Sequence, residues 1–179
     1  MIAWGVPELS VCRGEGLKRG ILAVTAGTVV AALAVCAYVQ VGYWRNSLTL
    51  FRHALAVTRG NYIAYYEIGL DLSSRGRLDA AIAHQRRALR LKPDFVYAHY
   101  EIGRALVKEG KPRQAIGHLR AALRIEPEFT EAHYYLGLAS AALGDTRAAV
   151  LEYRKALRLD PEYKNAATEL ARILGGPGE

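Results

Sequence analysis

The chain has 179 residues, of which 51% are hydrophobic, 24 are Lys or Arg and 17 are Asp or Glu. This length allows one ordinary domain with a small additional segment and excludes a large multidomain enzyme. The net charge of +7 invites a nucleic-acid partner, but we expect the basic residues to be spread along the helices rather than gathered into one stripe, and so expect no nucleic-acid binding. The two cysteines, Cys12 and Cys36, suggest neither a disulfide framework nor a zinc site.

An apolar segment follows an N-terminal flank of residues 1–20. Residues 21–39 carry no charge, and their only polar interruptions are Thr25 and Thr28. A helix rises about 1.5 Å per residue, so about twenty such residues cross a hydrocarbon core of about 30 Å. The sequence therefore predicts a transmembrane helix over residues 21–44 and a single-pass protein of the bacterial inner membrane.

The orientation and processing of this segment leave alternatives open. Basic residues flank both ends almost equally, and the adjacent pair Lys18 and Arg19 favours a cytoplasmic N-terminus with the rest of the chain outside the cytoplasm. Small residues near Cys36 also fit the cleavage region of a signal peptide, which would give a secreted protein. A lipoprotein signal with Cys36 as the lipidated residue fits poorly, because Val35 stands where that motif requires a small residue.

The remainder of the chain is an internal repeat with a period of 34 residues, the interval between Pro93 and Pro127. Each period predicts two amphipathic helices, with glycine ending the first helix and proline following the second. One helix pair cannot bury its own apolar face, so successive pairs must stack into an all-α helix-turn-helix solenoid. The recurring positions are Pro93, Pro127 and Pro161; Gly69, Gly103 and Gly137; Gly76, Gly110 and Gly144; Ala81, Ala115 and Ala149; and Ala88, Ala122 and Ala156.

The run from Tyr65-Tyr66-Glu67-Ile68-Gly69 through Ala81 and Ala88 to Pro93, with its two later copies, resembles the tetratricopeptide repeat signature. This resemblance implies about three and a half repeats, preceded by the apolar segment. The expected boundaries are a half repeat or junction helix at 45–61, full repeats at 62–95, 96–129 and 130–163, a capping helix at 164–174 and a disordered tail at 175–179.

The junction carries a second resemblance. The apolar segment running into Gln40-Val41-Gly42-Tyr43-Trp44-Arg45-Asn46-Ser47 and then into repeats is similar to the C-terminal part of bacterial protein O-mannosyltransferase-like membrane proteins. The stretch Ala3-Trp4-Gly5-Val6-Pro7-Glu8-Leu9 resembles the last loop before their final membrane helix. The resemblance implies a repeat module that lacks the catalytic part of such a protein.

In tetratricopeptide repeats the first helix of each pair lines a concave groove that binds peptides. Tyr66, Tyr100 and Tyr134 share one phase of the repeat, so their rings either contact a peptide or pack between helices. Arg104 and Lys108 lie one helical turn apart and either hold a carboxylate of the ligand or face solvent. The resemblance places these residues on the groove: Ile63, Tyr66, Leu70, Tyr97, Tyr100, Arg104, Lys108, Glu131, Tyr134 and Leu138.

No catalytic or metal-binding motif is recognisable. His84 and His118, like His99 and His133, lie one repeat period apart, so the repeat explains them without a metal. The sequence contains no nucleophile with a partner base and no phosphate-binding loop. We therefore expect a membrane-anchored scaffold for protein–protein interaction that is not an enzyme and needs no cofactor or metal. The alternatives are the glycosyltransferase-like repeat module and a secreted or lipid-anchored repeat protein.

Overall fold

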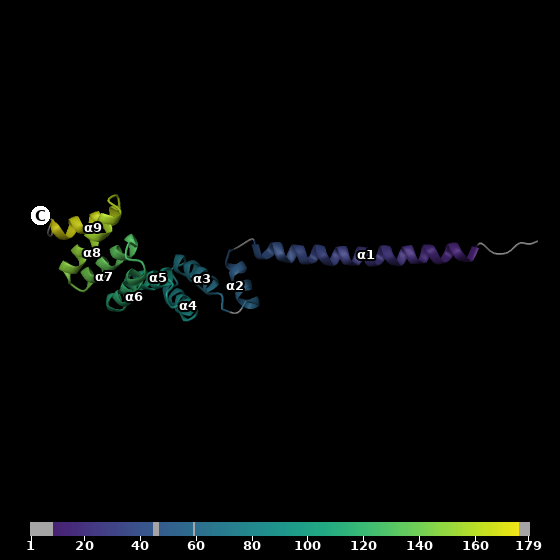
Figure 1. Cartoon of the computed structure of the whole chain (residues 1–179), viewed down its shortest axis with the longest axis horizontal. Helices are drawn as coiled ribbons and strands as arrows, with labels where there is room; N and C mark the ends of the chain where they lie inside the picture. Colours follow the sequence, from purple (N-terminus) through teal and green to yellow (C-terminus); the bar gives the residue numbers. More distant parts are fainter. Residues whose placement is uncertain (1–8, 45–46, 59, 176–179) are drawn as a thin grey trace, which may run out of the picture. The chain divides into compact units, whose positions relative to one another are not determined.

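The computed structural model describes residues 9–44, 47–58 and 60–175, and every regular element within them is an α-helix (Figure 1). The all-α prediction is therefore confirmed. The chain divides into two compact units, residues 1–49 and 50–179, which we describe separately. The helices are α1 (Leu9–Trp44), α2 (Ser47–Val57), α3 (Tyr62–Ser74), α4 (Leu78–Leu91), α5 (Val96–Lys108), α6 (Pro112–Ile125), α7 (Thr130–Ala142), α8 (Thr146–Leu159) and α9 (Lys164–Leu174).

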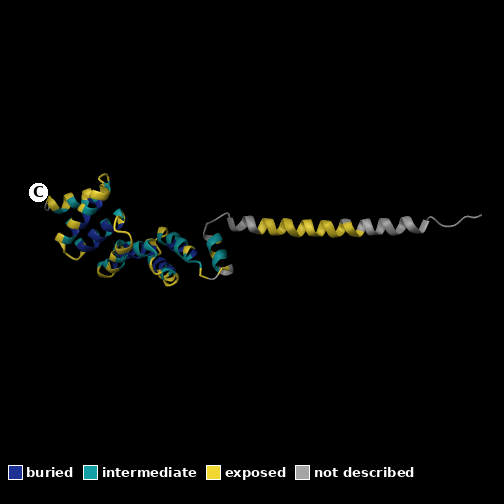
Figure 2. Cartoon of the chain, in the orientation of Figure 1, coloured by how far each residue is buried: buried dark blue, intermediate teal, exposed yellow. Residues whose placement is uncertain are grey.

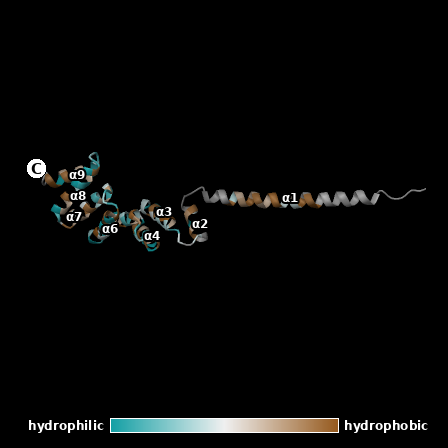
Figure 3. Cartoon of the chain, in the orientation of Figure 1, coloured by the Kyte–Doolittle hydropathy of each residue, from teal (hydrophilic) through white to brown (hydrophobic). Residues whose placement is uncertain are grey.

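The first unit consists mainly of α1. Its described side chains, between residues 21 and 39, are exposed (Figure 2) and largely apolar (Figure 3). A membrane span requires about twenty consecutive, mainly apolar residues. Within the described residues no helix is both long and apolar enough to cross a membrane. By this criterion the predictions of a transmembrane helix at 21–44 and of a single-pass membrane protein are wrong.

The second unit stacks helix pairs in chain order. Each pair, α3 with α4, α5 with α6 and α7 with α8, is joined by a short turn, and the second helix of each pair also packs against the next element along the chain. We call α3, α5 and α7 the first helices and α4, α6 and α8 the second helices. Buried side chains from both sets, among them Ile102, Leu119 and Leu136, form a continuous core, and Tyr153 packs with Ala166 of α9.

Glycine ends each first helix. Gly76, Gly110 and Gly144 have φ angles of 73°, 70° and 80°, a region that costs other residues about 1–2 kcal/mol. After Gly110, the backbone N–H of Lys111 donates to the carbonyl of Leu106 at 2.9 Å and so closes the end of α5. The predicted glycine turns are confirmed, and they set the tight hairpin of every pair.

A second glycine allows the two helices of each pair to approach closely. A Cβ atom added at Gly103 would lie 2.5 Å from Cγ of Leu119. The equivalent glycines, Gly69 and Gly137, meet the side chains of Gln85 and Tyr153 at 2.6 Å and 2.5 Å. One large side chain from each second helix therefore lies directly over a glycine of its partner helix.

Candidate functional site

Three tyrosines of the first helices pack across the boundaries between repeats. Each ring contacts the aromatic residue that stands immediately before the first helix of the next repeat or before α9. The rings therefore contribute to packing between repeats, which is one of the two roles expected from the sequence. The aromatic partners themselves recur with the period of the repeat, a pattern that could have revealed them from the sequence. The ring-centroid distances are 5.1 Å for Tyr66 to Phe95, 4.8 Å for Tyr100 to Phe129 and 5.4 Å for Tyr134 to Tyr163.

Packing leaves these tyrosine hydroxyls protonated. Burial is the main cause that raises the pKa of Tyr66 to about 12, and it likewise raises the pKa values of Tyr100 and Tyr134. Ionising a phenol inside such a partly buried, carboxylate-rich surface is unfavourable. At neutral pH each of the three rings therefore presents a neutral hydroxyl that can donate or accept a hydrogen bond.

The first helices are more exposed at another position of the repeat than at the position of Tyr66, Tyr100 and Tyr134. Ile63 and Tyr97 are 47% and 48% exposed, and Glu131 is exposed at the same position of the next repeat. The Tyr97 ring is held between Phe95 at 5.9 Å and Phe129 at 5.8 Å. It is thus an accessible ring in a fixed orientation.

The two leucines predicted for the groove are less accessible. Leu70 and Leu138 are only partly exposed, and Leu138 packs against the cluster around Tyr153. Tyr97 and Ile63 therefore offer more free apolar surface than Leu70 and Leu138.

Arg104 and Lys108 differ in their surroundings. Nε and Nη2 of Arg104 donate to Oε2 of Glu101 at 3.0 Å and 2.6 Å, and Nη2 also reaches Oγ of Ser73 in the preceding repeat at 3.4 Å. Lys108 is exposed at the end of α5, with no ion pair among the described residues. Glu101 already occupies part of the guanidinium, so Lys108 is the more available of the two cations.

Neither partner of Arg104 was predicted from the sequence. The spacing of three residues between Glu101 and Arg104 on one helix is a recognisable pattern of an ion pair. The contact with Ser73 spans 31 residues and depends on how two repeats stack. Only the first of these contacts could have been found from the sequence.

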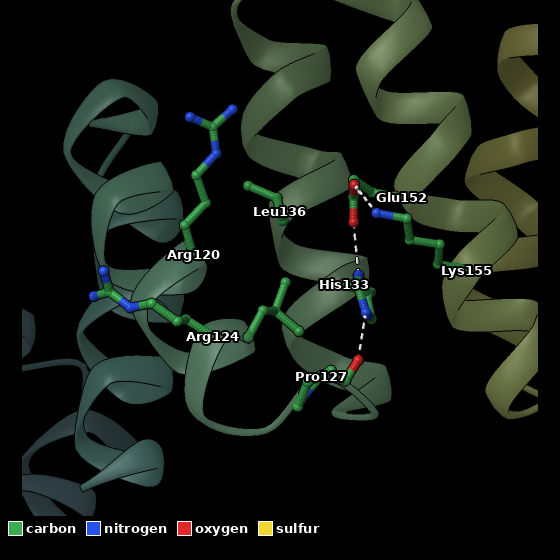
Figure 4. Close-up of a pocket in the computed structure, with 8 residues that line it drawn as sticks. Arg120, Arg124, Pro127, His133, Leu136, Glu152 and Lys155 are labelled. Atoms are coloured by element: carbon green, nitrogen blue, oxygen red, sulfur yellow. Dashed lines mark hydrogen bonds and ion pairs between the residues drawn. The ribbon is translucent and has the colours of Figure 1, made fainter. Parts of the chain in front are cut away.

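Helices α6, α7 and α8 together form a cleft that was not predicted from the sequence. A cavity of about 510 Å³ lies between α6 and α8, and side chains of α7 also line it (Figure 4). In it, Nδ1 of His133 lies 2.6 Å from Oε2 of Glu152, while Nζ of Lys155 donates to Oε1 at 2.8 Å. The lining residues are Arg120, Leu123, Arg124, Pro127, His133, Leu136, Glu152 and Lys155.

The hydrogen bonds favour the ionised form of Glu152. Nε2 of His133 lies 2.9 Å from the carbonyl of Pro127, which can only accept, so Nε2 carries a proton. Burial raises the pKa of Glu152, but the hydrogen bonds from His133 and Lys155 outweigh burial and leave this pKa below its usual value. The carboxylate of Glu152 thus accepts from Nζ of Lys155 and lies within hydrogen-bond distance of Nδ1 of His133.

The equivalent pair in the preceding repeat consists of two histidines. Nδ1 of His99 lies 3.3 Å from Nδ1 of His118, and Nε2 of His99 donates to the carbonyl of Pro93 at 3.0 Å. Burial, with the charges of His99 and Arg86, lowers the pKa of His118 to about 4. Among the described residues no three His, Cys, Asp or Glu side chains lie where they could hold a metal ion.

Solved structures share this arrangement of helices. The first tetratricopeptide repeat domain of Spaghetti (RPAP3) bound to the HSP90 peptide SRMEEVD has a TM-score of 0.63 and 23% identity, over 66% of this chain and 94% of that chain. MamA 41-end from Desulfovibrio magneticus RS-1 has a TM-score of 0.67 and 24% identity, over 75% and 76%. YrrB, described as a repeat protein with an unusual peptide-binding site, has a TM-score of 0.62 and 23% identity, over 74% and 68%.

Family models identify the repeats in the sequence itself. A comparison with curated proteins gave no match, and neither matching family model describes O-mannosyltransferase-like proteins. One tetratricopeptide repeat model matches residues 69–110, and a second matches residues 100–174. Together the two models cover residues 69–174, more than half of the sequence, and the chain belongs to the tetratricopeptide repeat family.

Proposed function

We propose that the chain is a scaffold that binds a peptide segment of a partner protein on the surface of the first helices. Tyr97 is the central contact of this surface, with Ile63 in the preceding repeat and Lys108 at the end of the same helix. The ligand that this surface fits has an apolar side chain for Tyr97 and a carboxylate for Lys108.

The fixed, half-exposed ring of Tyr97 is the observation that carries this proposal. Its position between Phe95 and Phe129 restricts the rotamers of the ring before any ligand arrives. A preorganised aromatic side chain gains contact area on binding while losing little conformational entropy. Such residues often contribute about 2 kcal/mol or more to a peptide interface.

Two of the similar structures support a peptide as the ligand. The RPAP3 domain is described as bound to the HSP90 peptide SRMEEVD, and YrrB is described as having an unusual peptide-binding site. The peptide SRMEEVD contains two adjacent Glu residues and ends in Asp. Carboxylates of this kind can pair with Lys108 and with the N–H groups of Arg104 that Glu101 does not use. Repeat scaffolds of one shape bind unrelated ligands, so the partner is defined here by chemistry alone.

Selection from a random peptide library displayed on phage tests the proposal. Peptides enriched on the full chain are synthesised with a fluorophore and titrated by anisotropy against wild type, Tyr97→Ala and Leu151→Ala. Leu151 is 54% exposed on α8 and serves as the matched control, because it removes exposed apolar surface from a second helix. We expect Tyr97→Ala to weaken binding at least about tenfold and the control to stay within about twofold.

The proposal fails if no peptide is enriched, or if Tyr97→Ala and Leu151→Ala weaken binding equally. A thermal melt of each variant accompanies the titrations, since loss of binding through unfolding would lower the melting temperature as well. Tyr97→Phe provides a further check, because it keeps the ring and should retain most of the affinity.

Three expectations from the sequence stay predictions. The resemblance of the junction to O-mannosyltransferase-like proteins predicts a native protein much larger than 19.6 kDa, which an immunoblot with an antibody against the repeats would detect. Cleavage near Cys36, with or without lipidation, predicts a mature N-terminus that protein sequencing would locate. The absence of enzymatic activity likewise stays a prediction.

A further inference from the structure

Arginine recurs along the second helices with the period of the repeat. Four arginines share one phase on α2, α4, α6 and α8, and a second set follows one helical turn later on the last three of these helices. All seven side chains are exposed. The first set is Arg52, Arg86, Arg120 and Arg154, and the second set is Arg90, Arg124 and Arg158.

The fold separates charge between the two sets of helices. The second helices α4, α6 and α8 carry ten Lys or Arg residues and two acidic residues. The first helices α3, α5 and α7 carry two basic and four acidic residues. Basic residues that are spread along the sequence therefore gather on one set of helices in the folded solenoid, which the sequence analysis did not anticipate.

These arginines have no acidic partners in the described part of the chain. The ion pairs found there involve Arg75, Arg104, Lys111, Lys155 and Arg172, together with His133, but none of the seven recurring arginines. Unpaired exposed arginines in register produce a positive potential that favours a polyanionic partner. Their guanidinium groups remain available for bidentate contacts with carboxylates.

The cleft between α6 and α8 gives this surface a shape. Arg120 and Arg124 line it from α6 and Lys155 from α8 (Figure 4). Leu123 of α6, Leu136 of α7 and Pro127 supply apolar lining. A neighbouring cavity of about 210 Å³ shares Pro127, His133 and Lys155 with the first cavity and adds Arg158 and Leu159. The two oxygens of Glu152 are already engaged, Oε1 by Nζ of Lys155 and Oε2 by Nδ1 of His133, which reduces their repulsion of an anionic ligand.

Exposed apolar side chains accompany the arginines. Leu91, Ile125 and Leu159 each follow an arginine of the second set and are 45%, 41% and 38% exposed. The exposed surface of α4, α6 and α8 therefore carries both cationic and apolar groups, and the lining of the cleft combines the same two kinds of group. A ligand that matches it must carry carboxylates and apolar side chains in alternation.

We propose that the cleft between α6 and α8 is a second docking surface, which binds an acidic and apolar segment of a partner protein. Carboxylates of that segment contact Arg120 and Arg124, and its apolar side chains lie on Leu123 and Leu136. Single-stranded nucleic acids are bound through stacking on exposed aromatic rings. The only aromatic side chain on α4, α6 and α8 apart from histidine is Tyr153, which is 0% exposed, so the surface favours a peptide over a nucleic acid.

Fluorescence anisotropy with the full chain tests this proposal. The probe is a fluorescein-labelled peptide of about twelve residues with the repeating sequence Glu-Leu-Glu-Ala, which spans at most about 40 Å. The test variant is Arg120→Gln with Arg124→Gln, and the matched control is Arg113→Gln with Arg147→Gln, which removes the same charge from the N-terminal ends of α6 and α8. Losing two charge-assisted contacts should weaken binding at least about tenfold, while the control should change binding by less than about threefold.

Three further arms decide between occupants. A peptide with Gln in place of Glu should bind at least about tenfold more weakly if carboxylates make the contacts. A single-stranded oligonucleotide or vesicles of an anionic phospholipid that bind more tightly than the peptide would overturn the assignment to an acidic protein segment. Equal losses in the test and control variants would also overturn it, because they would indicate unspecific attraction to net charge.

Tyr97→Ala should leave the binding of the acidic peptide unchanged, which separates this cleft from the surface of the first helices.

Discussion

Nδ1 of His133 lies 2.6 Å from Oε2 of Glu152, and the other ring nitrogen donates to the carbonyl of Pro127. The pair joins the start of α7 to the middle of α8, and His133 is only 7% exposed. Because one ring nitrogen bonds to the loop and the other faces Glu152, the ring of His133 is held by the loop as well as by the carboxylate.

Removing this carboxylate should destabilise the third repeat. Glu152→Gln leaves a buried imidazole with a weaker acceptor, and we expect the free energy of unfolding to fall by about 1–3 kcal/mol in urea titrations. Glu128→Gln, in the exposed loop before α7, is the control and should change it by less than about 0.5 kcal/mol. Equal effects of the two substitutions would show that the pair adds nothing to stability.

The lowered pKa of His118 should make stability depend on pH. The pKa of His118 is lowered from 6.5 to about 4 in the folded chain, so the unfolded chain binds the proton first. The contribution of neutral His118 to the free energy of unfolding is complete above pH 6.5 and is lost as the pH falls from 6.5 to about 4. Because the side chain is partly exposed, we expect a loss on the order of 1 kcal/mol.

Urea midpoints measured across this pH range test the prediction. The groups that face His118 are His99 and Arg86, and neither supplies a negative charge that would favour protonation. The lowered pKa of Glu152 acts mainly below pH 4.5 and therefore falls outside most of this window. His118→Gln should flatten the dependence between pH 6.5 and 4.5, and an unchanged slope in this variant would assign the dependence to another group.

Two glycines on adjacent helices should respond oppositely to the same substitution. Gly103→Ala places a Cβ atom 2.5 Å from Leu119, so the helices must separate, and stability should fall by about 1–3 kcal/mol. Gly117→Ala on the exposed face of α6 meets no atom within 4 Å. It should raise stability by about 0.5–1 kcal/mol through helix propensity. Thermal melts of the two variants give the comparison, and a stabilised Gly103→Ala would contradict the close approach.

Gln85 occupies the position that Leu119 occupies in the next repeat. Its side chain is 2% exposed, its Nε2 donates to the carbonyl of Tyr66 at 3.2 Å, and its Oε1 has no hydrogen-bond partner among the described residues. Gln85→Leu loses one weak hydrogen bond but removes a buried acceptor that costs about 1–3 kcal/mol. We expect a gain of about 1 kcal/mol, and the reverse change, Leu119→Gln, should destabilise the chain. A less stable Gln85→Leu would mean that the hydrogen bond to Tyr66 outweighs the orphaned oxygen.

The interaction surfaces were only partly predictable. The phase of Tyr66, Tyr100 and Tyr134 was evident from the period of the repeat, but whether their rings face a ligand or the next repeat depends on Phe95, Phe129 and Tyr163. The pairing of Arg104 with Glu101 was within reach of helix spacing, whereas its contact with Ser73 required two stacked repeats. The transmembrane prediction followed from an uncharged run, and the described helices do not support it.

The sequence by itself determined the helical repeat, because glycine, alanine and proline recur where a tight turn, a close helix contact or a helix end admits little else. The tertiary structure alone decided which charges and rings meet. His133 and Glu152 lie 19 residues apart, as do His99 and His118, and only helix packing brings each pair together. The arginines of α4, α6 and α8 become one surface for the same reason, since stacking converts a regular period in the sequence into proximity in space.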